Sequence, residues 1–261
     1  MVVRLLVTAD IHSPKYFGRF REAVRGLGRF DGVLIAGDLM EGGSIDGLRV
    51  LIDVLRGLSD VVFAVPGNHD IFSVSDNREV LPRARALGFI RWLNDEVVKV
   101  PLGGVMFRIV GSEGSLERPT RWQSRNMPGI VDVYRHRVKW LRGVLSSPFP
   151  EGLTVLLVHY SPSFRTVVGE DPRVWPMLGV RDLEGVVFGN GVIAVHGHAH
   201  EARVRCVRSG GSYIINASFI NLWRPIVLEV DGGGVRSVDV DCVEVPRGGK
   251  GGGKSILDFM G

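Results

Sequence analysis

Residues 2–12 read VVRLLVTADIH, an apolar stretch that gives way to an aspartate and a histidine. A run that is apolar at successive positions, apart from Arg4, predicts a central strand buried on both faces. Four more runs along the chain have the same character, and each is followed by side chains with oxygen or imidazole donors. They span residues 32–36, 61–65, 154–158 and 192–195.

The segments between these runs have helical spacing. Apolar residues recur at helical intervals over residues 15–29 and 45–58, and again over 130–145 ahead of the fourth run. This alternation predicts an α/β fold whose consecutive strands are parallel and joined by crossover helices. A hairpin is expected across Gly103-Gly104, and residues 115–129 and 163–179 are expected to be long loops. Short antiparallel strands are expected to close a second sheet at 204–207, 213–216, 225–230 and 235–241.

The side chains that follow the five runs form a single chemical set. They are Asp10, His12, Asp38, Asn68, His69, His159, His198 and His200. Any one of them alone fits a helix cap or a turn, but sites in parallel sheets form at the carboxyl ends of strands, where all of them would meet. Oxygen and imidazole donors without thiolates suit manganese, iron or zinc. Their number exceeds the needs of one ion and favours two divalent ions that share a carboxylate, the arrangement of two-metal phosphoryl transfer.

The ordered motifs Asp-x-His, Gly-Asp, Gly-Asn-His-Asp, His and Gly-His-x-His, from Asp10 to His200, resemble those of the calcineurin-like metallophosphoesterase superfamily. The resemblance implies a four-layer αββα sandwich of two mixed β-sheets over residues 1–245, with a dinuclear metal site at the carboxyl strand ends. It also implies the ligands of each ion. Asp10, His12 and His200 would bind one metal, Asn68, His159 and His198 the other, and Asp38 would bridge the two.

Two residues beside the ligands would serve the reaction. By its motif position His69 would face the substrate, where it stabilises phosphoryl oxygens or protonates the leaving group. Asp70 would either orient His69 through a hydrogen bond or cap a helix. His196 lies outside the motif and is expected either to support the ligands from behind or simply to pack at the strand end.

The resemblance implies a metal-dependent hydrolase that cleaves phosphodiester or phosphomonoester bonds, with nucleotides as the substrate class, through a metal-bridging hydroxide. Protein phosphatases carry Asp-Arg shortly after their Gly-Asp, whereas here Gly37-Asp38 is followed by LMEGG, which disfavours a phosphoprotein substrate. Two alternatives stay open: a nuclease acting on DNA or RNA, and a metal-binding scaffold without turnover.

Composition adds modest constraints. The chain has 261 residues, a formal net charge of +4 and a pI near 9.3, which mildly favours anionic partners. The substrate contacts expected in the two long loops are Arg121, Trp122, Arg165, Arg173 and Trp175. Cys206 and Cys242 form no CxxC pattern and are expected to be buried thiols. The absence of a long apolar segment and of a signal-peptide pattern predicts a cytoplasmic protein without membrane contact.

The C-terminal residues 246–261 form a Gly-rich segment that is expected to be a flexible tether. Residues 248–255 match the P-loop letters, but too few residues follow for the helix that a P-loop requires. Residues 256–260, ILDFM, are similar to the peptide with which replication and repair proteins bind the sliding clamp, although the usual leading glutamine is replaced by Gly253. The alternative is a tail that docks on its own domain or stays disordered.

Overall fold

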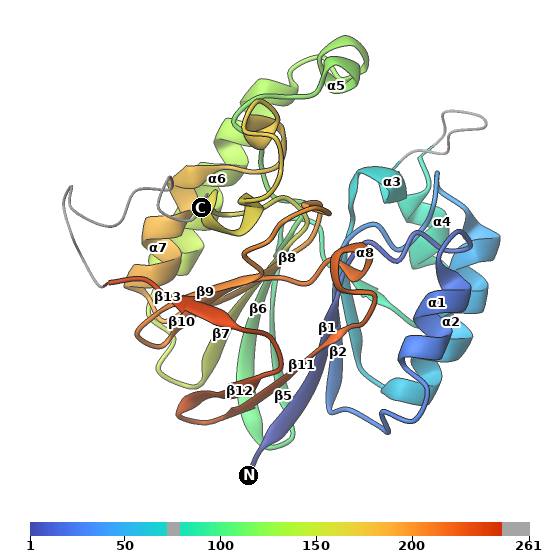
Figure 1. The fold of residues 1–261 in the computed structure, drawn as a ribbon, viewed down its shortest axis with the longest axis vertical. Coiled ribbons are helices and arrows are strands. Elements are labelled where there is room, and N and C mark those ends of the chain that lie inside the picture. The colour runs from blue at the N-terminus through green and yellow to red at the C-terminus, as the bar shows by residue number, and fades with distance from the viewer. Residues whose placement is uncertain (72–78, 247–261) are drawn as a thin grey trace.

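The computed structural model describes residues 1–71 and 79–246, and Figure 1 shows their arrangement. The P-loop letters at 248–255 and the clamp-type peptide at 256–260 lie outside the described residues. The domain boundary at residue 245 therefore stays a prediction.

The first sheet has six strands in the order β12-β11-β1-β2-β3-β4. Its parallel part follows the sequence pattern, because β1 to β4 lie side by side in chain order. β11 and β12 extend it on the other side of β1 in antiparallel fashion. The strands are β1 (Val3–Thr8), β2 (Gly32–Ala36), β3 (Val62–Val65), β4 (Arg91–Trp92), β11 (Ile226–Asp231) and β12 (Gly234–Val238).

The second sheet has seven strands in the order β13-β9-β10-β8-β7-β6-β5. Its central strands β6, β7, β8 and β10 are parallel, and the predicted hairpin is confirmed as the antiparallel pair β5 and β6. The strands are β5 (Glu96–Leu102), β6 (Val105–Ser112), β7 (Leu153–Val158), β8 (Ile193–His196), β9 (Cys206–Ser209), β10 (Ser212–Asn216) and β13 (Cys242–Glu244).

The apolar runs are buried on both faces because side chains of a strand alternate between two cores. Leu5 and Val7 of β1 lie in the core between the sheets, whereas Leu6 lies in the core under the helices. In β7, Leu157 faces the core between the sheets and Leu156 faces the helices on the other side. Each sheet therefore packs against the other sheet with one face and against helices with the other.

Helices cover the two outer faces (Figure 1). Those on the first sheet are α1 (Phe17–Ala23), α2 (Ile45–Leu58) and α4 (Leu81–Arg85), and those on the second are α6 (Ile130–Ser146) and α7 (Glu184–Gly189). Ser44 caps α2 by accepting a hydrogen bond from the Gly47 amide, and apolar side chains then recur on one face of the helix. The predicted αββα sandwich is confirmed.

The remaining helices are short and lie between the larger elements. They are α3 (Asn68–Ile71), α5 (Arg121–Asn126), α8 (Phe219–Leu222) and the 3₁₀ turns η1 (Arg165–Val167), η2 (Trp175–Met177) and η3 (Arg181–Leu183). Among residues 1–71 and 79–246, no helix combines the length and apolar character that crossing a membrane would need.

The structure corrects three expectations. β11 and β12 join the first sheet, not the second, because Leu228 and Val230 of β11 enter the core between the sheets when β11 pairs with β1. The expected loop at 115–129 contains α5, whose first turn is fixed by a capping box between Thr120 and Gln123.

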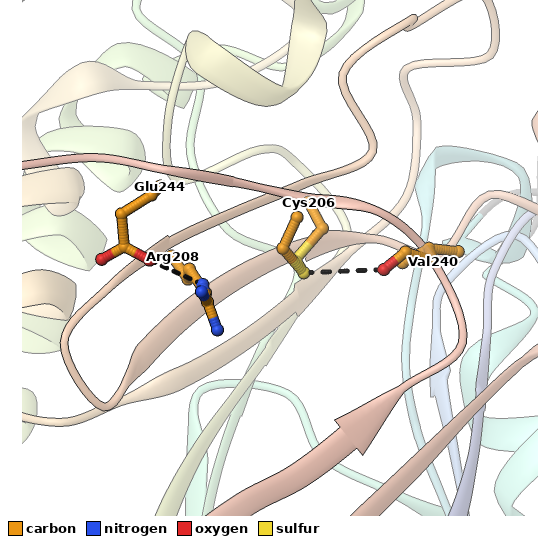
Figure 2. The surroundings of a disulfide bond; sticks show 5 residues. Cys206, Arg208, Val240 and Glu244 are labelled. Carbon is orange, nitrogen blue, oxygen red and sulfur yellow. Dashed lines mark hydrogen bonds and ion pairs between the residues drawn. A yellow bond between two sulfur atoms is a disulfide. The ribbon is translucent and has the colours of Figure 1, made fainter.

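The third correction concerns the cysteines. Cys206 and Cys242 form a disulfide between β9 and β13, as Figure 2 shows. The two strands are neighbours in the second sheet with Cys206 directly opposite Cys242, so the pairing register brings the two sulfur atoms together. The spacing of 36 residues in the sequence does not reveal this proximity.

Candidate metal centre

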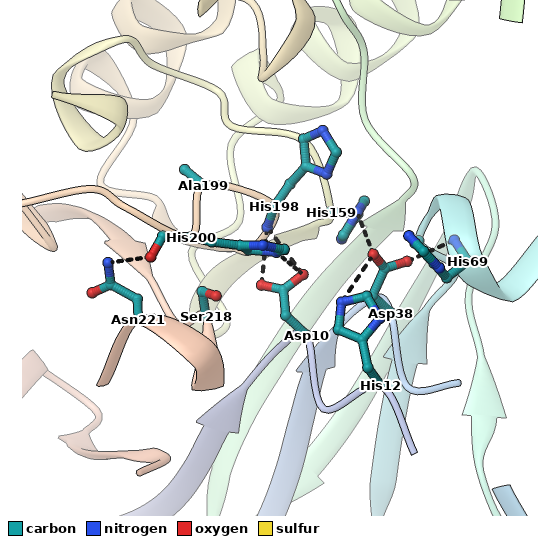
Figure 3. A network of polar contacts seen from close by, with 12 residues as sticks. Asp10, His12, Asp38, His69, His159, His198, Ala199, His200, Ser218 and Asn221 are labelled. Atoms are coloured by element: carbon teal, nitrogen blue, oxygen red, sulfur yellow. Dashed lines mark hydrogen bonds and ion pairs between the residues drawn. The ribbon is translucent and has the colours of Figure 1, made fainter. Parts of the chain in front are cut away.

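The carboxyl ends of five strands bring the predicted ligands together at one edge of the sandwich (Figure 3). Asp10 and His12 follow β1, Asp38 follows β2, and Asn68 begins α3 after β3. The second sheet contributes His159 after β7 and two histidines after β8. The groups whose ligand atoms lie within 4.8 Å of one another are Asp10 with His12 and His200, Asp38 with His159 and His198, and His12 with Glu41 and His69.

The backbone at these strand ends is unusual. Asp10, His12, Asp38 and His198 have positive φ angles between 45° and 68°, a left-handed conformation that few residues other than glycine adopt. Short polar side chains tolerate it better than bulky ones, but it still costs free energy that the surrounding structure must offset. Strained backbone is thus concentrated where the candidate ligands turn inward.

Two glycines allow the strand ends to approach one another. A Cβ atom on Gly67 would lie 2.2 Å from Asp38 Oδ1, and one on Gly197 would lie 2.6 Å from the Ala9 Cβ. Both distances are far below van der Waals contact. The glycines of the Gly-Asn-His-Asp and Gly-His-x-His motifs therefore provide the space in which Asp38 and Asp10 pack.

His159 is oriented by the backbone. Its Nδ1 lies 2.9 Å from the Ala36 carbonyl oxygen, so the neutral ring must carry its proton there and leave the Nε2 lone pair free. Nε2 in turn lies 3.5 Å from Asp38 Oδ2 and 3.1 Å from Asn68 Oδ1. An unprotonated nitrogen facing two oxygen acceptors is unfavourable unless a cation lies among them.

His198 is held in the same manner. Its Nε2 lies 3.3 Å from the Met177 carbonyl oxygen, and its backbone amide donates to Asp10 Oδ2 at 3.0 Å. Protonation on the Met177 side leaves Nδ1 as the free ring nitrogen. Such carbonyl contacts fix the tautomer and the orientation of metal-binding histidines.

The other half of the centre has buried atoms without partners. Among the described residues, Nε2 of His12 and Nε2 of His200 have no partner with hydrogen-bond geometry, and His12 Nδ1 faces only the Glu41 carboxylate, whose Oε2 lies 2.8 Å away. His12 Nε2 lies 3.6 Å from Asp38 Oδ2, and His200 Nε2 lies 3.4 Å from Asp10 Oδ1. Buried polar atoms normally have hydrogen-bond partners. These nitrogen and oxygen atoms are therefore suited to act as ligands of a divalent cation.

The protonation equilibria also suit cations. Burial lowers the pKa of both His12 and His159 to about 4, so the rings are neutral near pH 7, as metal ligation requires. Burial and the neighbouring carboxylates Asp70 and Asp10 raise the pKa of Asp38 well above its ordinary value. A nearby cation would favour the ionised form of Asp38 that this environment disfavours.

His69 lies next to the ligands. Its backbone amide donates to Asp38 Oδ1 at 2.8 Å, and its ring centroid is 4.7 Å from that of His12. Burial lowers the pKa of His69 below its ordinary value, so its ring too is neutral near pH 7. The position agrees with the predicted substrate-facing role, which stays a prediction.

Asp70 is buried and bound to backbone. Its carboxylate accepts hydrogen bonds from the amides of Gly67, Leu39 and Met40 at 3.0, 3.2 and 2.9 Å. In the described part of the chain these amides, and not the His69 ring, are its hydrogen-bond partners. Asp70 therefore joins the turn after β2 to the turn after β3, and any effect on His69 acts through the backbone.

Glu41 was not among the predicted site residues. Its Oε2 lies 2.8 Å from His12 Nδ1, and its Oε1 lies 3.9 Å from Lys15 Nζ. A sequence signal for Glu41 exists, because it follows Asp38 of the Gly-Asp motif by three residues. Glu41 thus adds a carboxylate to the His12 side of the centre.

His196, which the motif leaves out, packs near the strand end as expected. Its Nε2 lies 2.7 Å from Thr166 Oγ1 and its Nδ1 lies 2.8 Å from the Gly197 carbonyl oxygen. The ring is fully buried. Both nitrogens are therefore satisfied by the protein.

The predicted substrate contacts divide into two groups. Arg165 pairs with Glu184 at 3.0 Å, Arg173 pairs with Asp171, and Trp175 is buried and donates to the Glu170 carbonyl oxygen. Arg121 and Trp122 are exposed on α5. Arg165 and Trp175 are thus held within the fold, whereas Arg173, Arg121 and Trp122 lie at the surface.

Comparisons with known proteins agree with this geometry. The family model described as calcineurin-like phosphoesterase matches residues 3–202. The crystal structure of a phosphopantetheinyl hydrolase from Mycobacterium tuberculosis is similar, with a TM-score of 0.60, 16% identity, and coverage of 82% of this chain and 88% of that one. A 5'-nucleotidase precursor from Thermus thermophilus gives 0.48 at 17% identity, covering 92% of this chain and 54% of that one. No curated protein matches the sequence. At 16% identity, the likeness to the phosphopantetheinyl hydrolase shows the fold alone. The TM-score of the nucleotidase match is too low for any further conclusion.

Proposed function

Because this chain belongs to the calcineurin-like phosphoesterase family and is a hydrolase acting on phosphoester bonds, we propose that it uses two divalent ions to cleave phosphodiester or phosphomonoester bonds of nucleotides. Manganese, iron and zinc all suit the oxygen and imidazole donors. One ion would be held by Asp10, His12 and His200, the other by Asn68, His159 and His198, with Asp38 shared.

One observation carries the two-ion proposal. His12 Nε2 and His159 Nε2 lie 3.6 and 3.5 Å from the same oxygen, Asp38 Oδ2. A carboxylate that faces two neutral imidazoles from two different strands is suited to bridge two cations. When bound, the ions would supply positive charge to polarise the phosphoryl group and lower the pKa of a water molecule.

The chain's own residues orient and protonate the substrate. The neutral ring of His69 would donate a hydrogen bond to a phosphoryl oxygen, and the ring would deliver a proton to the leaving oxygen only in its imidazolium form, which the negative charge of a bound phosphate would favour. The hydrogen bond from the His69 amide to Asp38 fixes the position of the His69 backbone, from which the imidazole ring extends. Asp70 holds the two turns that carry Asp38 and His69 at a constant separation.

Hydrolysis of bis-p-nitrophenyl phosphate and p-nitrophenyl phosphate, with manganese, iron, zinc and cobalt each supplied, tests this function. We expect metal-dependent release of p-nitrophenol, and its loss in His69→Ala. His136→Ala is the matched control, because His136 is exposed on α6 and its ring contacts only the helix carbonyl of Asp132 among the described residues. No turnover with any of the four metals would contradict the proposal.

The second candidate is a metal-binding scaffold. It predicts full metal content by elemental analysis without turnover of either ester. The complete donor set and the presence of His69 beside it favour the enzyme.

A further inference from the structure

A cavity lined by arginines lies beside the metal centre. It has a volume of about 630 Å³ and is formed by α5 together with the segment before and within η2. None of its lining residues is acidic. They are Arg118, Pro119, Arg121, Ser124, Arg125, Arg173, Val174 and Met177.

Two arginines of α5 lack the ion pairs that several arginines of the longer helices form in the described part of the chain. In α2 and α6, Arg49, Arg56 and Arg135 each pair with an aspartate three residues earlier, at 2.7 to 3.1 Å. Across residues 1–71 and 79–246, neither Arg121 nor Arg125 forms a hydrogen bond or an ion pair with another side chain. The charge of these two guanidinium groups is thus uncompensated and available to an anion.

The cavity is held in place by the fold. Gln123 completes the capping box of α5 and donates from Nε2 to the Tyr160 hydroxyl oxygen at 3.0 Å. Tyr160 donates in turn to the buried Glu113 at 3.0 Å. On the other wall, the Arg118 guanidinium donates to the Arg173 carbonyl oxygen at 2.9 Å. Both walls are therefore fixed before any ligand arrives.

The cavity and the metal centre share neighbours. Met177 lines the cavity, and its carbonyl oxygen lies 3.3 Å from His198 Nε2. The Tyr160 ring, which anchors α5, lies 4.9 Å from the His198 ring between centroids. In Figure 1, α5 stands beyond the edge of the sandwich where the strand ends meet. The cavity and the metal centre are thus joined through Met177 and Tyr160.

We propose that this cavity binds the backbone phosphates of a single-stranded nucleic acid, so that the ester cleaved at the metal centre belongs to a polynucleotide strand. Arg121 and Arg125, which have no acidic partner in the described part of the chain, match the regular negative charge of such a backbone. Trp122, 49% exposed on the same helix, offers aromatic surface on which an unpaired base can stack, which a base-paired duplex would not present. This inference rests on the proposed function in placing a nucleotide ester at the metals.

The test is binding of a fluorescein-labelled 12-residue oligothymidylate to the full-length protein, followed by fluorescence anisotropy at several salt concentrations. A His69→Ala background keeps the strand intact. We expect the added pair Arg121→Ala and Arg125→Ala to weaken binding roughly tenfold at low salt. The slope of log K against log salt should fall in magnitude by about 1.4, the loss of two phosphate contacts on a single strand.

The matched control is Arg49→Ala with Arg56→Ala, which removes the same charge from the distant helix α2. Its binding and salt slope should stay at the level of the background. The α5 variant should unfold at the same denaturant concentration as the background protein, which excludes misfolding.

Unchanged binding in the α5 variant, an equal loss in the α2 control, or a duplex that binds as tightly as the single strand would each overturn the proposal. Tight, α5-dependent binding without hydrolysis of any ester would instead contradict the proposed function and leave this binding site standing.

Discussion

His12 and His159 approach Asp38 at nearly the same distance, 3.6 and 3.5 Å, but their surroundings differ. The His159 ring is oriented by the Ala36 carbonyl, and its neighbour His198 by the Met177 carbonyl. Within the described residues, the His12 ring has no such partner, and Glu41 lies beside it. One half of the centre is thus preorganised by backbone carbonyls, whereas on the other half His12 faces the half-exposed side chain of Glu41.

Ligands of one motif set can therefore hold their two ions with different affinity. Ligands whose orientation is already fixed lose less conformational freedom on binding. We therefore expect the ion at His159 to be held more tightly than the ion at His12.

The largest effect is expected where the two halves meet. Asp38→Asn removes the negative charge that both imidazoles face, and should lower the rate of ester hydrolysis by about 10³-fold, equivalent to about 4 kcal/mol. Steady-state kinetics and metal content measure it. Asp60→Asn, at an exposed carboxylate that pairs with Arg29, should leave both the rate and the metal content unchanged. An Asp38→Asn protein with two ions and half the activity would contradict a bridging role.

Metal removal separates the halves. Dialysis against a limited amount of chelator should release one ion first, because we expect the two affinities to differ by about 10- to 100-fold. His12→Ala should keep the tighter ion, and His159→Ala should lose it. Calorimetric titration of the metal-depleted proteins gives both constants. Equal constants in the wild-type protein would remove the asymmetry inferred here.

Glu41 sharpens the comparison on the His12 side. Glu41→Gln removes the carboxylate charge beside His12 Nδ1. It should weaken binding of the ion on the His12 side about tenfold, since such partners raise ligand basicity. The affinity for the ion on the His159 side should be unaffected. Glu22→Gln, at an exposed residue of α1 that pairs with Arg25, is the control. A loss at both ions would show that Glu41 supports the whole centre.

The smallest effect on the metals is expected at Asp70. Asp70→Asn places amide hydrogens against backbone donors and should lower the free energy of unfolding by about 2 kcal/mol. Ion affinities should change little once the protein is saturated with metal. Chemical denaturation measures the change, with Asp53→Asn on α2 as a solvent-exposed control. An unchanged free energy would mean that the three amide contacts contribute nothing net.

Much of this centre could be predicted from local sequence. Each strand end combines an apolar run with a polar turn, and parallel pairing then places the turns at one edge. The sequence could not reveal which nitrogen of His159 is free, because the Ala36 carbonyl that decides it lies 123 residues away. Nor could it show that Asp70 binds backbone amides of the Asp38 turn, a contact formed by tertiary structure alone.

The predictions for residues 226–230 and for the segment that contains α5 differ from the structure for separate reasons. Alternation in residues 226–230 predicts a half-buried strand but cannot say to which sheet it belongs, and the free side of β1 decides that. The helix α5 was readable, because Thr120 and Gln123 have the spacing of a capping box. The charges of Arg121 and Arg125 could be read too, but not the absence of acidic partners around them.

The disulfide has a consequence for how the two sheets are connected. Between Cys206 and Cys242 the chain leaves the second sheet after β10, crosses to form β11 and β12 in the first, and returns as β13. The disulfide thus closes a covalent ring between two cysteines 36 residues apart, and this ring includes strands of both sheets. By restricting the unfolded chain, such a ring stabilises the folded state by about 4 kcal/mol. Because one sheet carries Asp38 and the other His159, the ring joins the two walls of the metal centre covalently.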